Sequence, residues 1–186
     1  MKRVFDIFIS LILIILLSSL MVFILIAVKL TSKGPILYWS NRMGKSNVFF
    51  KMPKFRTMKV STPVLATHLL HNPESYLSPI GGFLRRYSLD ELPQLFIIIK
   101  GDMSLVGPRP ALFNQDNLIN LRSKSSLDMI LPGITGLAQV NGRDDLTISE
   151  KVSLDVEYMN SMSIFLDIKI LFSTFFKVFS KVGISH

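Results

Sequence analysis

The sequence IFISLILIILLSSLMVFILIAV, residues Ile7 to Val28, decides how the rest of the chain is organised. It carries no charge, and its only polar side chains are Ser10, Ser18 and Ser19. A helix of this length is roughly 33 Å long at about 1.5 Å per residue, which is enough to cross the hydrocarbon core of a bilayer. The segment is therefore predicted to be a membrane helix.

Basic residues flank this helix at both ends, with Lys2-Arg3 before it and Lys29 and Lys33 after it. Basic flanks favour the cytoplasmic side of a membrane, so both ends are expected on that side. The helix would then be re-entrant, turning back inside the bilayer at a break formed by Ser18-Ser19 near its midpoint. A simple crossing of the membrane stays open as the alternative.

Composition limits what the remaining chain can be. The protein has 186 residues, 49% of them hydrophobic, which suits one folded domain and excludes a disordered chain. It contains no cysteine, so a disulfide framework, a thiolate nucleophile and a Cys-ligated metal site are excluded. These observations divide the chain into a membrane segment, residues 1–32, and a single domain, residues 33–186.

The formal net charge of +8 is concentrated near the membrane segment, since ten Lys and Arg but only one acid occur between Met1 and Asn72. The basic stretch from Lys51 to Lys59, which includes Lys54 and Arg56, either binds anionic lipid or phosphate or is a solvated basic face. No nucleic-acid-binding motif accompanies it, so nucleic acid is not an expected partner.

The motif Ser88-Leu89-Asp90-Glu91-Leu92-Pro93-Gln94 follows Arg85-Arg86 and precedes an apolar run. Ser88 and Glu91 have the spacing of a helix capping box, which is the purely structural interpretation. A capping box leaves Asp90 and the two arginines unexplained. Carboxylates beside guanidinium groups can hold a phosphate and a divalent cation together, so Asp90 is a candidate nucleophile or metal ligand.

Two further turns carry an arginine. In Pro108-Arg109-Pro110 the prolines fix the backbone on both sides of Arg109. The stretch from Pro132 to Arg143 combines a Gly-rich turn with Asn141-Gly142, a hairpin signal. Three arginine-bearing turns beside paired carboxylates predict a phosphate-handling site.

The C-terminal segment, residues 164–182, is rich in Phe and contains three lysines. This composition predicts an amphipathic helix at the membrane interface, and a helix buried against the domain is the alternative.

Several motifs in this order resemble one family over nearly the whole chain. They are Lys2-Arg3 with Asp6, Lys54-Phe55-Arg56-Thr57-Met58, Ser88 to Gln94, Lys100 to Pro110, Pro132 to Arg143 and Leu154 to Tyr158. The chain is similar to the bacterial sugar transferases, the small monotopic polyprenyl-phosphate phosphoglycosyl transferases. It departs from them at Ser18-Ser19, where family members commonly have Ser-Pro.

The resemblance implies a mainly helical α+β fold, made of one membrane-embedded domain. Its parts would be an N-terminal re-entrant helix-break-helix, short β-hairpins, a catalytic domain on the cytosolic face and C-terminal interfacial helices. The implied location is the cytoplasmic face of the bacterial inner membrane.

The implied reaction moves a sugar 1-phosphate from a UDP-sugar to undecaprenyl phosphate through a covalent intermediate on Asp90, and it releases UMP. Mg²⁺ is the implied cofactor, with Asp90 and Glu91 as its ligands. The implied phosphate-binding residues are Lys54, Arg56, Arg85, Arg109 and Arg143.

Candidate partners besides these substrates are the phospholipid membrane, downstream glycosyltransferases and a second copy of the chain. The rival hypothesis is a non-catalytic membrane scaffold for glycan-assembly enzymes. The sequence does not predict the donor sugar or the glycan pathway.

Overall fold

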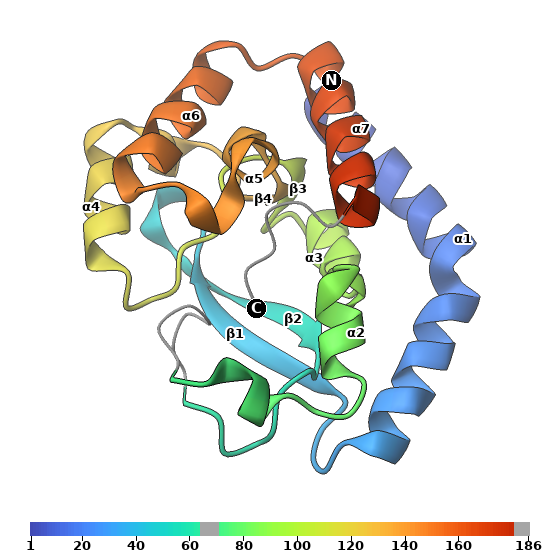
Figure 1. Ribbon diagram of the computed structural model, residues 1–186. Coiled ribbons are helices and arrows are strands. Elements are labelled where there is room, and N and C mark those ends of the chain that lie inside the picture. Colours follow the sequence, from blue (N-terminus) through green and yellow to red (C-terminus); the bar gives the residue numbers. More distant parts are fainter. Residues whose placement is uncertain (64–70, 181–186) are drawn as a thin grey trace.

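The computed structural model describes residues 1–63 and 71–180, and these form a mainly helical α+β fold with two small sheets (Figure 1). The α-helices are α1 (Lys2–Thr31), α2 (Gly81–Arg86), α3 (Gln94–Lys100), α4 (Asp116–Lys124), α5 (Leu137–Asn141), α6 (Ile148–Asn160) and α7 (Ile164–Ser180). The strands are β1 (Leu37–Met43), β2 (Phe49–Phe55), β3 (Ser104–Val106) and β4 (Gly133–Thr135). Short 3₁₀ turns are η1 (Lys45–Asn47), η3 (Pro73–Tyr76), η4 (Leu89–Glu91), η5 (Leu127–Met129) and η6 (Arg143–Asp145).

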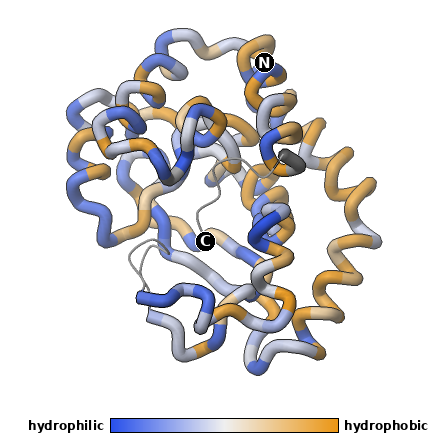
Figure 2. Tube along the Cα trace, viewed as in Figure 1, coloured by the Kyte–Doolittle hydropathy of each residue, from blue (hydrophilic) through white to orange (hydrophobic). Residues whose placement is uncertain are grey.

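Helix α1 is the long apolar helix that the sequence predicts, and by length and composition it could cross a membrane. Figure 2 shows hydrophobic residues along nearly all of it. Half of these side chains are exposed, with Ile15 at 72% and Leu16 at 68% near the middle of the helix, and only Ile24 and Val28 are buried. A water-soluble domain rarely exposes so continuous an apolar surface, so α1 indicates membrane association.

The predicted helix break at Ser18-Ser19 is wrong, because α1 is one unbroken helix of 30 residues. Serine, unlike proline, keeps its backbone N–H, so the helical hydrogen bonds continue through both positions. The Ser18 hydroxyl donates to the Ile15 carbonyl at 2.9 Å, a contact that bends helices. Figure 1 shows the helix bowed away from the domain at its middle while both ends lie against it.

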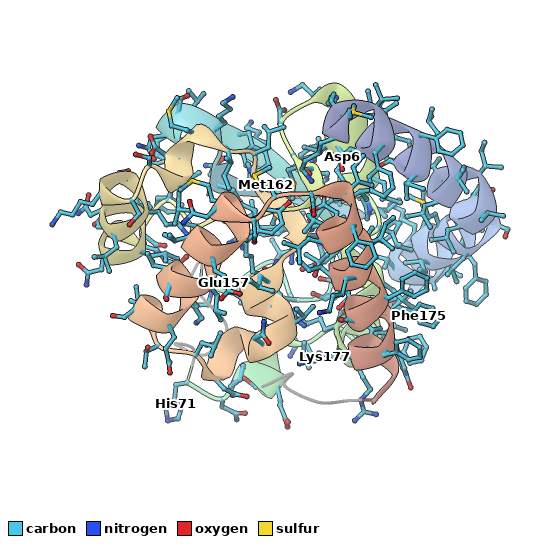
Figure 3. The ribbon with its side chains drawn as sticks, turned by 90° about the horizontal axis from the view of Figure 1, so that it is seen from above. Asp6, His71, Glu157, Met162, Phe175 and Lys177 are labelled. Carbon is cyan, nitrogen blue, oxygen red and sulfur yellow. The ribbon has the colours of Figure 1, made fainter. Side chains whose placement is uncertain are left out.

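Polar contacts fix the first turn of α1 to the domain. Lys2 donates to Asp167 of α7 at 2.6 Å, and buried Asp6 accepts from the Ser104 hydroxyl at 2.8 Å. Arg3 donates to the carbonyls of Ile98 and Ile99 at the end of α3. Figure 3 places Asp6 where α1 meets the start of α7. The second half of α1 is held by apolar packing instead, through Ile24 and Val28.

The two sheets agree only in part with the predicted short hairpins. Strands β1 and β2 form an antiparallel hairpin, in which Tyr38 lies opposite Lys54. Strands β3 and β4 are parallel, so this second sheet is not a hairpin. Asn141-Gly142 does not form a hairpin turn either, because it ends helix α5 with Gly142 at φ 156°.

The parallel pair joins two loops whose backbones touch. A Cβ atom on Gly133 would lie 2.1 Å from the Gly107 nitrogen, closer than any side chain tolerates. The main core surrounds this pair and includes Leu95, Ile98, Leu105 and Tyr158. The core therefore holds the Pro-Arg-Pro loop and the Gly-rich turn in contact.

Helix α7 has two different faces, as the prediction of an amphipathic helix requires. Asp167 and Ile170 are buried against the domain, whereas Phe165, Phe172 and Phe176 are more than half exposed. Figure 3 shows Phe175 and Lys177 on opposite sides of this helix. The predicted segment continues to residue 182, and its residues from 181 onward lie outside the described part of the chain.

Candidate functional site

Asp90 and Glu91 lie in η4, a single 3₁₀ turn between α2 and α3. The chain reaches this turn through Ser88, whose backbone is left-handed with φ 52° and ψ 22°. Ser88 makes no side-chain cap, so the capping box that its spacing suggests does not form. The turn instead places both carboxyl groups on the domain's interior side, with Asp90 only 5% exposed.

Glu91 is held by two cations. Its Oε1 accepts from Lys54 Nζ at 2.8 Å and from Arg109 Nη2 at 2.9 Å. Burial by itself raises the pKa of Glu91, but the charges of Arg109 and Lys54 outweigh it and hold this pKa well below its usual range. Glu91 is therefore a fixed anion that keeps Lys54 and Arg109 in place.

Asp90 is held less closely than Glu91 by the surrounding cations. Its Oδ2 lies 3.8 Å from Lys54 Nζ, about 1 Å farther than the hydrogen bond that Lys54 makes to Glu91. Burial raises the pKa of Asp90, and the charge of Lys54 opposes this shift. Of the two carboxylates, Asp90 is thus the less tightly engaged and the better placed to react.

Arg85 and Arg143 complete the positive side of the site. Burial lowers the pKa of Arg85, while the nearby charges of Asp90 and Glu91 oppose that shift. Arg143, with φ 53°, follows the Gly-rich turn and lines the same cavity as Glu91 and Arg109. The structure brings the three predicted arginine-bearing turns together around the carboxylates.

The remaining predicted residues lie farther out. Arg56 lines a cavity with Lys54 and Asp90, and its Nε donates to the Pro35 carbonyl at 2.7 Å. Ser18 and Ser19, predicted as a membrane break, are exposed in the middle of α1 and do not belong to this site.

Two further arginines, which were not predicted as site residues, hold the Pro-Arg-Pro loop. Arg42 Nη1 donates to the Pro110 carbonyl at 3.0 Å, and burial lowers the pKa of Arg42 to about 10. Arg42 shares a face of the hairpin with Lys54, since Tyr38 pairs with Lys54 and side chains alternate along the strand. The sequence alone does not show that Arg42 and Lys54 share a face, because this depends on the register of the hairpin.

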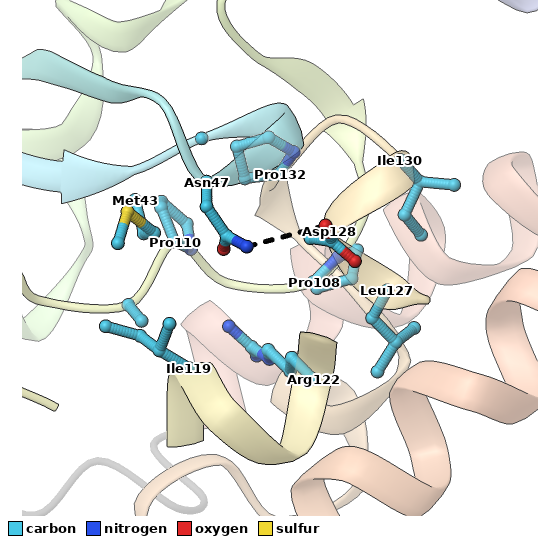
Figure 4. A pocket seen from close by; sticks show the side chains of 12 residues that line it. Met43, Asn47, Pro108, Pro110, Ile119, Arg122, Leu127, Asp128, Ile130 and Pro132 are labelled. Carbon is cyan, nitrogen blue, oxygen red and sulfur yellow. Dashed lines mark hydrogen bonds between the residues drawn. The ribbon is translucent and has the colours of Figure 1, made fainter. Parts of the chain in front are cut away.

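Arg122 of α4 contacts the loop from the other side. Its Nη1 donates to the Arg109 carbonyl at 2.6 Å, and its Nη2 pairs with Asp155 Oδ2 of α6 at 2.6 Å. Figure 4 shows Arg122 with Pro108 and Pro110 around a pocket of about 30 Å³, which can hold little more than water. This part of the structure supports the loop.

Two larger cavities adjoin the carboxylates. One of about 370 Å³ is lined by Glu91, Arg109 and Arg143 and extends toward α1 and α7. The other, of about 130 Å³, is lined by Lys54, Arg85 and Asp90 and by the hairpin. Lys54 lines the smaller cavity and Glu91 the larger one, and the two side chains are in contact at 2.8 Å.

Paired carboxylates surrounded by lysine and arginine side chains are typical of sites that bind phosphate groups. The comparisons agree with a site of this kind. The family model described as Bacterial sugar transferase matches residues 1–181, and the chain belongs to this family.

Named relatives cover most of the chain. It is 40% identical over 93% of its length to the undecaprenyl-phosphate glucose phosphotransferase of Komagataeibacter xylinus. It is 40% identical over 96% to the UDP-glucose:undecaprenyl-phosphate glucose-1-phosphate transferase of Escherichia coli K12. The chain spans only 35% and 40% of the lengths of these two relatives. It covers 83% of exopolysaccharide production protein ExoY of Rhizobium meliloti, at 36% identity.

Proposed function

We propose that this protein is a phosphoglycosyl transferase that moves a sugar 1-phosphate from a UDP-sugar to undecaprenyl phosphate. The products are undecaprenyl diphosphate-sugar and UMP. The observation that carries this proposal is the arrangement of Lys54, Arg85, Arg109 and Arg143 around one pinned carboxylate, Glu91, and one less engaged carboxylate, Asp90. The names of the relatives support the substrate class.

In the first half-reaction, a carboxylate oxygen of Asp90 attacks the sugar-bearing phosphorus of the donor. The bond from that phosphorus to the oxygen bridging to UMP breaks, and UMP leaves with the electron pair. Asp90 then carries the sugar 1-phosphate as an acyl phosphate. Arg85 and Arg143 are proposed to neutralise the phosphoryl oxygens during this step.

In the second half-reaction, a phosphate oxygen of undecaprenyl phosphate attacks the same phosphorus. The bond between this phosphorus and Asp90 breaks, which regenerates the carboxylate and completes the diphosphate. No proton transfer is required, because attacking and leaving oxygens are both ionised. Glu91 is proposed to keep Lys54 and Arg109 oriented through both steps.

Mg²⁺ fits this site with the donor as a further ligand. Among the described residues, no three His, Cys, Asp or Glu form a group that could hold a metal ion by themselves. Mg²⁺ commonly uses one or two carboxylates together with substrate phosphates, so Asp90 and Glu91 suffice as protein ligands. When bound, Mg²⁺ would neutralise charge on the diphosphate and on the departing UMP.

We also propose that the protein lies in the cytoplasmic leaflet of the bacterial inner membrane. Exposed apolar side chains of α1 and the exposed Phe residues of α7 would contact lipid. Arg3 at one end of α1 and Val28 at the other both contact the same domain. Because a crossing helix would separate its ends, these contacts favour a bent helix that returns to the side it entered.

The activity can be tested by measuring UMP release from a panel of UDP-sugars with undecaprenyl phosphate and Mg²⁺. The expected result is release that depends on the lipid and on Asp90. A folded preparation that releases no UMP with any donor would favour the scaffold alternative, in which the protein recruits glycan-assembly enzymes. Downstream glycosyltransferases and a second copy of the chain remain proposed partners.

The membrane topology can be tested separately. The chain has no cysteine, so variants with a single cysteine inserted directly after Met1 or replacing Lys33 report accessibility without a background signal. Labelling of both positions from the cytoplasmic side is expected, and labelling from opposite sides would reject the re-entrant arrangement.

A further inference from the structure

The lining of the larger cavity is polar and charged in one part and mainly apolar in another. Near the carboxylates it is lined by Ser88, Glu91, Arg109 and Arg143. Where it borders α1 and α7 it is lined mainly by aliphatic side chains, Leu13, Leu17, Leu171 and Val178, together with Thr174 and Lys177 of α7. Its volume of about 370 Å³ lies within the roughly 300–1,000 Å³ range of ligand pockets.

The apolar end lies between the two helices that expose apolar residues. On α1, Ile15 and Leu16 stand between cavity-lining Leu13 and Leu17 and are 72% and 68% exposed. On α7, Phe172 follows cavity-lining Leu171 and is 63% exposed. Each helix therefore presents one face to the cavity and a neighbouring face to the surroundings.

The polar end suits a phosphate group. Arg109 and Arg143 enter it from two different loops, and Arg109 is oriented by its 2.9 Å contact with Glu91. The smaller cavity has a different lining, made of Tyr38, Arg42, Lys54, Arg85 and Asp90. It contains none of the α1 or α7 side chains that line the larger one.

We infer that the lipid acceptor enters through the larger cavity. Its phosphate would lie at Arg109 and Arg143, and the first part of its prenyl chain would lie between Leu13 and Leu17 of α1 and Leu171 of α7. The sugar-bearing phosphate of the donor would lie at the smaller cavity, on the Asp90 side, with the rest of the nucleotide outside it. This inference rests on the proposed function and adds where each substrate binds.

The polar and apolar parts of the lining indicate which substrate binds in this cavity. A sugar nucleotide is polar throughout and would leave the leucine-lined end unsatisfied, whereas a prenyl phosphate matches both the cationic and the apolar end. Entry between α1 and α7 also lets the remainder of the prenyl chain stay in the bilayer, so only its head must leave the lipid.

The test compares a substitution inside the cavity with one on the outer face of the same helix. Leu17→Trp adds bulk within the cavity, and Ile15→Trp is the matched control on exposed α1 surface. With the full-length protein in nanodiscs, Leu17→Trp is expected to raise the KM for undecaprenyl phosphate by roughly tenfold or more. The KM of Ile15→Trp should match the wild type, and the burst of UMP with donor alone should persist in both variants.

A second measurement does not depend on the folding of a variant. Wild-type protein is irradiated with a prenyl phosphate that carries a diazirine near its phosphate end, and the labelled peptides are mapped. Labels at Leu13, Leu17 or Leu171 support the inference. Labels confined to Ile15, Leu16 and Phe172, or placed on the hairpin, would overturn it.

The outcomes separate the two proposals. Equal acceptor KM values for Leu17→Trp and Ile15→Trp, in a wild-type protein that turns over, would overturn the cavity assignment alone. Failure of the wild type to release UMP with any donor would overturn the proposed function and the inference together.

Discussion

Replacing Arg122 by Gln removes a side chain that joins three parts of the fold. Its guanidinium pairs with Asp155 at 2.6 Å and donates to the Arg109 carbonyl at 2.6 Å. The side chains of Arg122 and Asp155 are only 12% and 1% exposed. The variant leaves the Asp155 carboxylate buried without its cation, a change that typically destabilises a protein by about 3 to 5 kcal/mol. For a chain of this size, that corresponds to a fall in Tm of about 6 to 20 °C.

The double variant Arg122→Leu with Asp155→Leu is the matched control. It removes both charges, so no unpaired ion remains and most of the lost stability should return. The hydrogen bond to the Arg109 carbonyl is still missing, so kcat should stay about 10- to 100-fold below the wild type. Thermal unfolding by circular dichroism and UMP release measure the two effects separately.

The pH dependence of the Arg122→Gln variant provides a further check. Burial raises the pKa of Asp155, and Arg122 opposes that shift. Without Arg122 the pKa of Asp155 in the folded state rises further above its unfolded value. Protonation of Asp155 then favours the folded state, so the variant regains stability as the pH falls through this pKa and loses it as the pH rises. The deficit relative to the wild type should therefore shrink at lower pH. A loss below about 1 kcal/mol, typical of exposed ion pairs, or a double variant no more stable than Arg122→Gln, would refute the reasoning.

Three other predictions follow from the site and from α1. Asp90→Asn should lower turnover by roughly 10⁴-fold or more without lowering Tm, because an amide of the same volume cannot act as the nucleophile; near-normal turnover would eliminate that role. Ser19→Pro should destabilise α1 by less than the usual ~3 kcal/mol, since Ser18 already donates to the Ile15 carbonyl that the proline would leave unpaired, and combining it with Ser18→Ala should remove this compensation. Equal stability of the single and double variants, measured by thermal unfolding, would contradict this explanation. Chelation of divalent cations should stop UMP release and added Mg²⁺ should restore it, whereas full activity in chelator would exclude the metal.

Local sequence signals predicted the features that depend on neighbouring residues. The apolar run predicted α1, and the Phe-rich segment predicted α7 with its exposed face. The Asp90-Glu91 pair and its arginines were recognised because their residue types are unusual beside one another. Their convergence on one phosphate-handling site was predicted from these residue types, and the resemblance to the family assigned a role to each.

Features that depend on distant contacts were not predictable. The parallel pairing of Ser104 with Gly133 joins segments far apart in the chain, so no local signal indicates it. Asn141-Gly142 ends a helix because α5 packs against α6 and α7, a contact that the dipeptide does not reveal. Arg42 and Arg122 looked like ordinary surface cations, since nothing nearby in sequence shows that they hold the Pro-Arg-Pro loop.

The central claim is that Asp90 carries the sugar 1-phosphate between donor and acceptor. Intact-mass spectrometry of wild-type protein incubated with Mg²⁺ and an accepted UDP-sugar, without lipid, tests it most directly. The expected spectrum contains a species heavier by one sugar phosphate, which disappears when undecaprenyl phosphate is added and never forms on Asp90→Asn. An unmodified spectrum from a preparation that turns over with both substrates, or an adduct that persists on Asp90→Asn, would contradict the claim.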